Sequence, residues 1–157
     1  MKYLPHLFLL LLATLPARAV EVPVTTDLQA DARQAAERRV PLMLVVAADY
    51  CSFCKLLAEE FLKPMLLSGD YTDKVLIREL RIDDDDTIRD FDGAEISPDT
   101  IALRYRASLT PTLLFLDAQG REVAQRLVGV GTLDFYGEEI DQAILRALQG
   151  IRAPSRQ

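Results

Sequence analysis

"PLMLVVAADYCSFCK", residues 41–55, joins a long apolar run to both cysteines of the chain. The run from Leu42 to Ala48 is continuous and of strand length, which predicts a strand buried on both faces. From Ser52 to about Leu67, apolar residues recur at three-and-four spacing, which predicts a helix. Cys51 and Cys54 therefore lie where a buried strand passes into a helix.

The rest of the chain predicts further helices and strands in alternation. Asp27 is placed to cap a helix, and Pro64 should kink or end the helix that follows the cysteines. "DAQG", residues 117–120, is a turn signal that precedes a last strand of partial alternation. The segments are helices over 27–39, 96–106 and 133–148, and strands over 75–82, 112–117 and 121–129. This order predicts an α/β fold with a mixed central sheet and helices on both faces.

Length and charge narrow the classes of function. A chain of 157 residues, half of them hydrophobic, suits one folded domain. The formal net charge is −6, and an acidic balance argues against a nucleic-acid partner, which needs a basic surface. The acidic run from Asp83 to Asp86 does not fit a calcium-binding EF-hand loop, because Ile88 and Ala94 stand where that loop needs glycine and glutamate. We interpret this run as a solvated loop and expect no metal site.

The N-terminus has the features of a secretory signal peptide. Lys2 precedes an apolar run from Leu7 to Leu15, and Ala17-Arg18-Ala19 forms a small-x-small cleavage motif. We therefore expect residues 1–19 to be a cleaved signal peptide and residues 20–157 to form a domain in the periplasm. The apolar run is shorter than the roughly 20 residues of a spanning helix, so stable membrane insertion is not expected. An uncleaved membrane anchor is the alternative.

Cys51 and Cys54 are compatible with several kinds of site. Lys55 follows the second cysteine, at the place where a c-type haem site needs histidine. A structural zinc site needs four Cys or His ligands, whereas residues 20–157 hold two cysteines and no histidine, so only a dimer sharing one zinc ion would complete the set. A purely structural disulfide remains an alternative, although bridging so short a loop removes little unfolded-state entropy.

A redox pair agrees best with the position of the cysteines. Cys51 is expected at a helix N-terminus, where unpaired backbone N–H groups and the helix dipole favour a thiolate, the attacking species. Cys54 is expected one turn inside the helix and more buried. Cys51 would then attack a partner disulfide, and Cys54 would resolve the mixed disulfide.

Together with the later stretches "LTPTLLFLD" and "DAQGREV", the strand–CxxC–helix unit resembles thioredoxin. Residues 91–93 and 101–129 are similar to the SoxW-type periplasmic thioredoxins, and the whole resemblance covers residues 27–148. It implies a thioredoxin-like fold and thiol–disulfide exchange that needs no metal or organic cofactor. It also implies a cis bond between Thr110 and Pro111, facing the cysteines.

The same resemblance implies a substrate groove around the cysteines. Tyr50 and Phe53 have two interpretations at this place, because they either pack onto the domain or form an apolar lip that docks a partner chain. The implied groove residues are Tyr50, Ser52, Phe53, Thr110 and Pro111.

Two departures from thioredoxin bear on the mechanism. Thioredoxin carries a buried acid six residues before its first cysteine, where this chain has Val45. Glu59 and Glu60 are candidate proton acceptors for Cys54, although exposed glutamates are the commoner interpretation of that helix. Strongly oxidising relatives often place histidine between the cysteines, whereas Phe53 supplies no charge, which indicates a reductase-like or intermediate potential.

These points predict a periplasmic thiol–disulfide oxidoreductase that reduces disulfides of partner proteins. Its electrons would come from an upstream thiol reductant. A disulfide oxidase or isomerase that uses the same two cysteines is one alternative. A thioredoxin-fold module that binds a partner without turnover is the other.

The signal-peptide hypothesis makes a direct prediction about the secreted protein. N-terminal sequencing of protein from the periplasmic fraction should give a chain that begins near Val20, because the cleavage motif ends at Ala19. A full-length chain recovered from the membrane fraction would show instead that the apolar run is retained as an anchor.

Overall fold

The computed structural model describes residues 20–153, whose centre is a four-stranded sheet in the order β2–β1–β5–β6. Strand β1 runs parallel to β2 and antiparallel to β5, and β5 runs antiparallel to β6. The predicted mixed sheet is confirmed, with one parallel pair. The strands are β1 (Leu42–Ala47), β2 (Leu76–Arg81), β5 (Thr112–Leu116) and β6 (Leu127–Val128).

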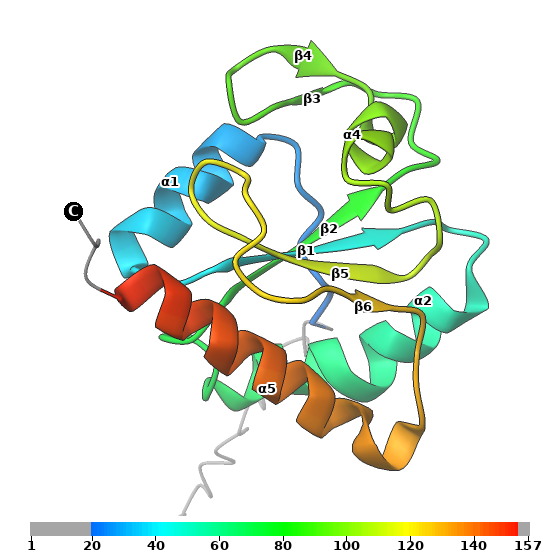
Figure 1. The fold of residues 1–157 in the computed structure, drawn as a ribbon. Coiled ribbons are helices and arrows are strands. Elements are labelled where there is room, and N and C mark those ends of the chain that lie inside the picture. The colour runs from blue at the N-terminus through cyan, green and yellow to red at the C-terminus, as the bar shows by residue number, and fades with distance from the viewer. Residues whose placement is uncertain (1–19, 154–157) are drawn as a thin grey trace, which may run out of the picture.

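Helices cover both faces of this sheet, as predicted (Figure 1). Helices α1 (Leu28–Arg38) and α4 (Pro98–Arg104) lie on one face, and α5 (Leu133–Arg152) lies on the other with the helix that follows the cysteines. Every residue of β1 is buried. Alternate β1 side chains enter the two apolar layers, because successive side chains of a strand point to opposite faces.

The helix after the cysteines continues past Pro64. It consists of α2 (Ser52–Leu57), the π-helical turn η1 (Ala58–Leu62) and α3 (Lys63–Ser68). In the π-helical turn the N–H of Lys63 bonds to the carbonyl of Ala58, five residues earlier. Proline has no N–H for the regular bond, and this wider turn precedes it. Of the two predicted effects of Pro64, ending the helix is therefore wrong, while the regular α-helix is interrupted just before it; the helix stops at Gly69, whose φ is 74°.

The segment before α1 is fastened along the free edge of β2. The backbone N–H of Thr25 donates to the carbonyl of Glu79, and the N–H of Glu79 donates to the carbonyl of Pro23, both at 2.8 Å. Val22 is buried in the same apolar layer as the π-helical turn. Asp27 then caps α1 by accepting a bond from the N–H of Ala30 at 2.7 Å, as predicted. This segment, residues 20–27, is called the lead-in, and it pairs with the outer edge of β2 at Glu79.

The structure differs from the sequence prediction after α4 and around residue 90. Of the predicted strand over 121–129, only β6 forms a ladder, while Glu122 makes an isolated bridge to Leu116. Between them the chain is irregular, and Arg126 of this stretch donates to the carbonyl of Tyr105. A short hairpin of β3 (Ile88–Arg89) and β4 (Glu95–Ile96) forms a second sheet that was not predicted.

An ion pair between a buried aspartate and a partly exposed arginine joins this hairpin to α4. Asp90 is 3 % exposed and accepts two bonds from Arg104, at 3.0 and 2.6 Å, and a third from the N–H of Phe91 at 2.8 Å. Burial alone would raise the pKa of Asp90, but the bonds from Arg104 and Phe91 outweigh it and hold the pKa below its usual value. The charged form of Asp90 therefore stabilises the folded state.

We predict that this ion pair contributes to stability at neutral pH. Because the folded-state pKa of Asp90 is depressed, its contribution is fully present above about pH 4, the unfolded-state value, and is lost as the pH falls through the folded-state value. Asp90→Asn should lower the free energy of unfolding by about 1–3 kcal/mol at pH 7, measured by urea denaturation. It should also flatten the loss of stability below pH 4.

Asp92→Asn is the matched control, since Asp92 lies two residues away and is exposed. It should leave both the stability at pH 7 and its acid dependence unchanged. Equal effects of the two substitutions would contradict the role assigned to Asp90.

Candidate active site

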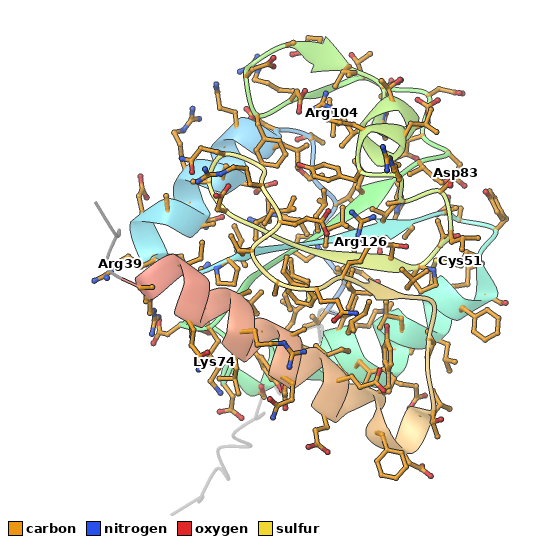
Figure 2. The ribbon with its side chains drawn as sticks, viewed as in Figure 1. Arg39, Cys51, Lys74, Asp83, Arg104 and Arg126 are labelled. Carbon is orange, nitrogen blue, oxygen red and sulfur yellow. A yellow bond between two sulfur atoms is a disulfide. The ribbon has the colours of Figure 1, made fainter. Side chains whose placement is uncertain are left out.

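The two cysteines lie where β1 ends and α2 begins, as the sequence predicts. Cys51 is the residue that caps α2, and its N–H bonds to the carbonyl of Ala48 at 3.1 Å. Cys51 and Cys54 form a disulfide with a Cα–Cα distance of 5.2 Å. Figure 2 shows Cys51 at the edge of the molecule, beside the end of the sheet where Asp83 also lies. A disulfide at this edge can be approached by another molecule.

Cys51 Sγ has two polar neighbours within the described part of the chain. It accepts a hydrogen bond from the N–H of Cys54 at 3.1 Å, and it lies 3.4 Å from the carbonyl oxygen of Thr110. The N–H would stabilise a thiolate at Cys51, since a hydrogen bond to the charged form favours that form. The carbonyl can accept only from the protonated thiol. Both of these polar contacts of Cys51 Sγ therefore come from the backbone.

The expected difference in burial between the cysteines is wrong for the disulfide form. Cys51 and Cys54 are each 8 % exposed. The loop that carries Thr110 approaches Cys51, and both cysteines belong to one buried cluster with Ala47 and Ala48. Any difference in reactivity must then come from the hydrogen bond to Cys51 and from the start of the helix rather than from exposure.

Thr110 and Pro111 form the wall opposite Cys51. The peptide bond between them is cis in the structure. Thr112 Oγ1 donates to the carbonyl of Leu109 at 2.6 Å, which fastens the loop just before β5. This loop places the Thr110 carbonyl beside the disulfide. The sequence-predicted residues Thr110, Pro111 and Cys51 are thus brought together.

Large apolar side chains near the disulfide are exposed to solvent. Tyr50 is 78 % exposed and Phe53 is 58 % exposed, so neither packs onto the domain. Ser52 is also exposed, and Leu109, which was not singled out from the sequence, is 70 % exposed. We call Tyr50, Phe53 and Leu109 the apolar rim. Sequence reasoning missed Leu109, although its position beside Thr110 was a usable signal.

One residue of the acidic run supports the cysteine loop. Asp83 Oδ2 accepts a hydrogen bond from the N–H of Asp49 at 2.8 Å, and both residues are exposed. Because β1 and β2 are parallel, their carboxyl ends meet at the same edge of the sheet, which is the signal that could have predicted this contact. Within residues 20–153, no group of three or more potential ligands is placed to hold a metal ion.

The two glutamates considered as proton acceptors do not lie in buried surroundings. Glu59 and Glu60 are both exposed, and Glu59 bonds to Lys63 at 2.7 Å. Val45 is 1 % exposed and packs in the apolar layer beneath α2. The position before the cysteines where thioredoxin carries an acid is therefore fully apolar in this chain.

Comparison with known proteins assigns the family. A sequence profile of the thioredoxin-like domain matches residues 28–144, which is most of the chain. The chain belongs to the thioredoxin-like domain family. No curated protein matches its sequence significantly.

Solved thioredoxin structures share the fold of this thioredoxin-like domain. A thioredoxin h from poplar superposes with a TM-score of 0.54 at 20 % identity, covering 80 % of this chain and 97 % of that one. Thioredoxin from Malassezia sympodialis gives 0.54 at 18 % identity, with 87 % and 97 % covered. Oxidised thioredoxin O2 from Arabidopsis thaliana gives 0.52 at 19 % identity, with 76 % and 91 % covered. At these identities the similarity shows the fold.

The thioredoxin-like domain with its CxxC pair is a thiol–disulfide oxidoreductase. In such exchange a thiolate attacks one sulfur of a disulfide, and the other sulfur leaves with the electron pair. Cys51 and Cys54 are at bonding distance, so the pair can close into a disulfide after one sulfur has formed a mixed disulfide. Dithiol and disulfide forms of the pair differ by two electrons and two protons.

We predict that Cys51 is alkylated faster than Cys54 in the reduced protein. The N–H of Cys54 favours the thiolate at Cys51, and the thiolate is the species that reacts. Brief iodoacetamide treatment followed by mass mapping measures the two sites in one sample. Equal labelling, or faster labelling of Cys54, would contradict the assignment of Cys51 as the attacking residue.

Proposed function

We propose that the protein reduces disulfides of partner proteins in the periplasm and is itself reduced by an upstream thiol reductant. Cys51 attacks the partner disulfide, and Cys54 then releases the partner. The observation that carries the reducing direction is the neutral surroundings of Cys51 Sγ, whose polar neighbours are the N–H of Cys54 and the carbonyl of Thr110.

The reducing direction follows from how the dithiol form is stabilised. Strong oxidants in this family of reactions stabilise their reduced form, chiefly by stabilising the thiolate. Phe53, between the cysteines, carries no charge, and the carboxylate of Asp49 lies 3.8 Å from Arg81. An uncharged side chain at position 53 gives the thiolate no electrostatic stabilisation. The balance supports a stable disulfide and hence a reducing dithiol.

The apolar rim supports a polypeptide as the substrate. Exposed aromatic side chains offer a large contact area for another chain. A partner docked on Tyr50, Phe53 and Leu109 would bring its disulfide to Cys51, with Thr110 and Pro111 on the other side. Ser52 lies between the cysteines, so it would face the docked chain.

The periplasmic location rests on the signal-peptide features of residues 1–19, which lie outside the described residues. A search of the described part of the chain finds no helix that is long and apolar enough to cross a membrane. The resemblance to SoxW-type periplasmic thioredoxins supports the same location.

The reduction potential tests the proposed direction. We expect a value more negative than about −200 mV, nearer to thioredoxin than to the strong oxidants. Equilibration of the protein with glutathione and dithiothreitol buffers, with the thiol content read by mass spectrometry, gives this value. A potential above −200 mV would favour the oxidase or isomerase alternative.

Phe53→His is an informative variant, with Phe53→Leu as its control. Histidine at this position would stabilise the thiolate and should shift the potential to less negative values, whereas leucine should leave it nearly unchanged. A shift of equal size in both variants would mean that packing, not charge, sets the potential.

A further inference from the structure

Cys54 must lose a proton before it can close the disulfide, and its immediate surroundings are apolar. It belongs to a buried cluster with Cys51, Ala47 and Ala48, and Ile82 packs against that cluster. A buried thiol in apolar surroundings keeps its proton, so some group must accept it. Glu59 and Glu60 are exposed, and the buried side chain of Val45 has no atom that can accept a proton.

Glu79 of β2 lies on the side of the sheet that α2 covers. In the parallel register of β1 and β2, Glu79 is the partner of Val45, and Arg81 is the partner of Ala47. Ile77 packs in the layer formed with the helix after the cysteines. Because side chains alternate along a strand, Glu79 and Arg81 point to the same face as Ile77.

The carboxylate of Glu79 bonds to Arg81, which lies two residues further along β2 and nearer to the cysteine loop. Its Oε1 atom lies 2.7 Å from Nε of Arg81, and Arg81 Nε lies 3.8 Å from Oδ1 of Asp49 in the cysteine loop. The carboxylate is therefore held between the levels of Val45 and Ala47, and Ala47 belongs to the same buried cluster as Cys54. Neighbouring strands are about 4.8 Å apart, so Glu79 lies beside Val45 on the face of the sheet that the helix after the cysteines covers.

Glu79 is also shielded from bulk solvent. Its side chain is 14 % exposed. The backbone bonds of Glu79 to Pro23 and Thr25 hold the lead-in over this edge, and Lys63 binds Glu21 of the lead-in at 2.9 Å. The Glu79 carboxylate is therefore largely removed from bulk water, on the face of the sheet that α2 covers.

We propose that Glu79 is the group that accepts the proton of Cys54 when the mixed disulfide is resolved, an inference that deepens the thiol–disulfide exchange described above. The Cys54 S–H passes its proton to the Glu79 carboxylate through one water, and the thiolate attacks Cys51 Sγ. The Cys51–Cys54 bond forms as the bond from Cys51 to the partner breaks. The partner sulfur leaves with the electron pair and takes up a proton, so the partner gains two electrons and the cysteine pair loses two.

Several charged side chains near Glu79 and the helix after the cysteines form ion pairs. The hydrogen bond that Arg81 donates to Glu79 raises the pKa of Arg81, which keeps Arg81 cationic. Asp49 and Asp84 are the further acids that act on Arg81. On the helix, Lys63 bonds to Glu59 and Glu21, while Glu60 and Lys55 are exposed. Of the acidic residues named here, Glu79 is the one whose side chain is largely buried and projects from the sheet on the face that α2 covers.

A two-phase release experiment separates the attack of Cys51 from the closure by Cys54. Reduced protein mixed with excess 5,5′-dithiobis(2-nitrobenzoate) releases one thionitrobenzoate when Cys51 attacks and a second when Cys54 closes the disulfide. We expect Glu79→Gln to leave the first phase within about twofold and to slow the second by about tenfold or more. Glu60→Gln is the matched control and should change neither phase.

The pH profile gives a readout that a structural role would not move. Without a protein-bound acceptor, closure depends on hydroxide, so the second-phase rate of Glu79→Gln should rise about tenfold per pH unit near neutrality, more steeply than in the unmodified protein. Glu79→Asp, which keeps the charge with a shorter reach, should recover part of the rate. If Glu79→Gln does not fold, the Asp variant carries the test alone, and an unchanged second phase there overturns the proposal.

Three results would overturn the role of Glu79. These are an unchanged second phase in Glu79→Gln, equal slowing of both phases, or slowing of the second phase by Glu60→Gln instead. Failure of the exchange activity itself would look different, because the unmodified protein would then lack the first phase.

Discussion

The burial of β1 on all sides is the constraint from which the site follows. Helices lie over both of its faces, and β2 and β5 occupy both of its edges. A chain that leaves such a strand must satisfy its backbone groups within a few residues. The bonds from Cys51 to Ala48 and from Asp49 to Asp83 do this, and the helix begins at once. The cysteine pair is thus held at the point where the core reaches the surface.

The elements with strong apolar patterns could be predicted from the sequence. Strand β1 is a continuous apolar run, and α1 has a capping aspartate at its start, so local signals suffice for both. The pair β3–β4 and the strand β6 have two residues each, which is too short for a period to be recognised. The irregular chain before β6 depends on the bond from Arg126 to Tyr105, a contact between distant segments.

The site shows the same division between local and distant information. The positions of Cys51 and Cys54 at a helix start follow from the local pattern, which the structure confirms. The equal burial of the two cysteines depends on how closely the Thr110 loop approaches. The relation of Glu79 to Cys54 depends on the register between β1 and β2, which no local pattern of β2 reveals. Residues far apart in sequence therefore modify a reaction whose main parts are local.

The most direct test of the division of labour between the cysteines is covalent trapping of partners. Cys54→Ser retains the attacking sulfur but cannot close the disulfide, so mixed disulfides with partner proteins should accumulate. Non-reducing gels of Cys54→Ser and Cys51→Ser, with mass spectrometry of the adducts, compare the two. Adducts that disappear with reductant and form mainly with Cys54→Ser are expected. Adducts that form mainly with Cys51→Ser, or with neither variant, would contradict attack by Cys51.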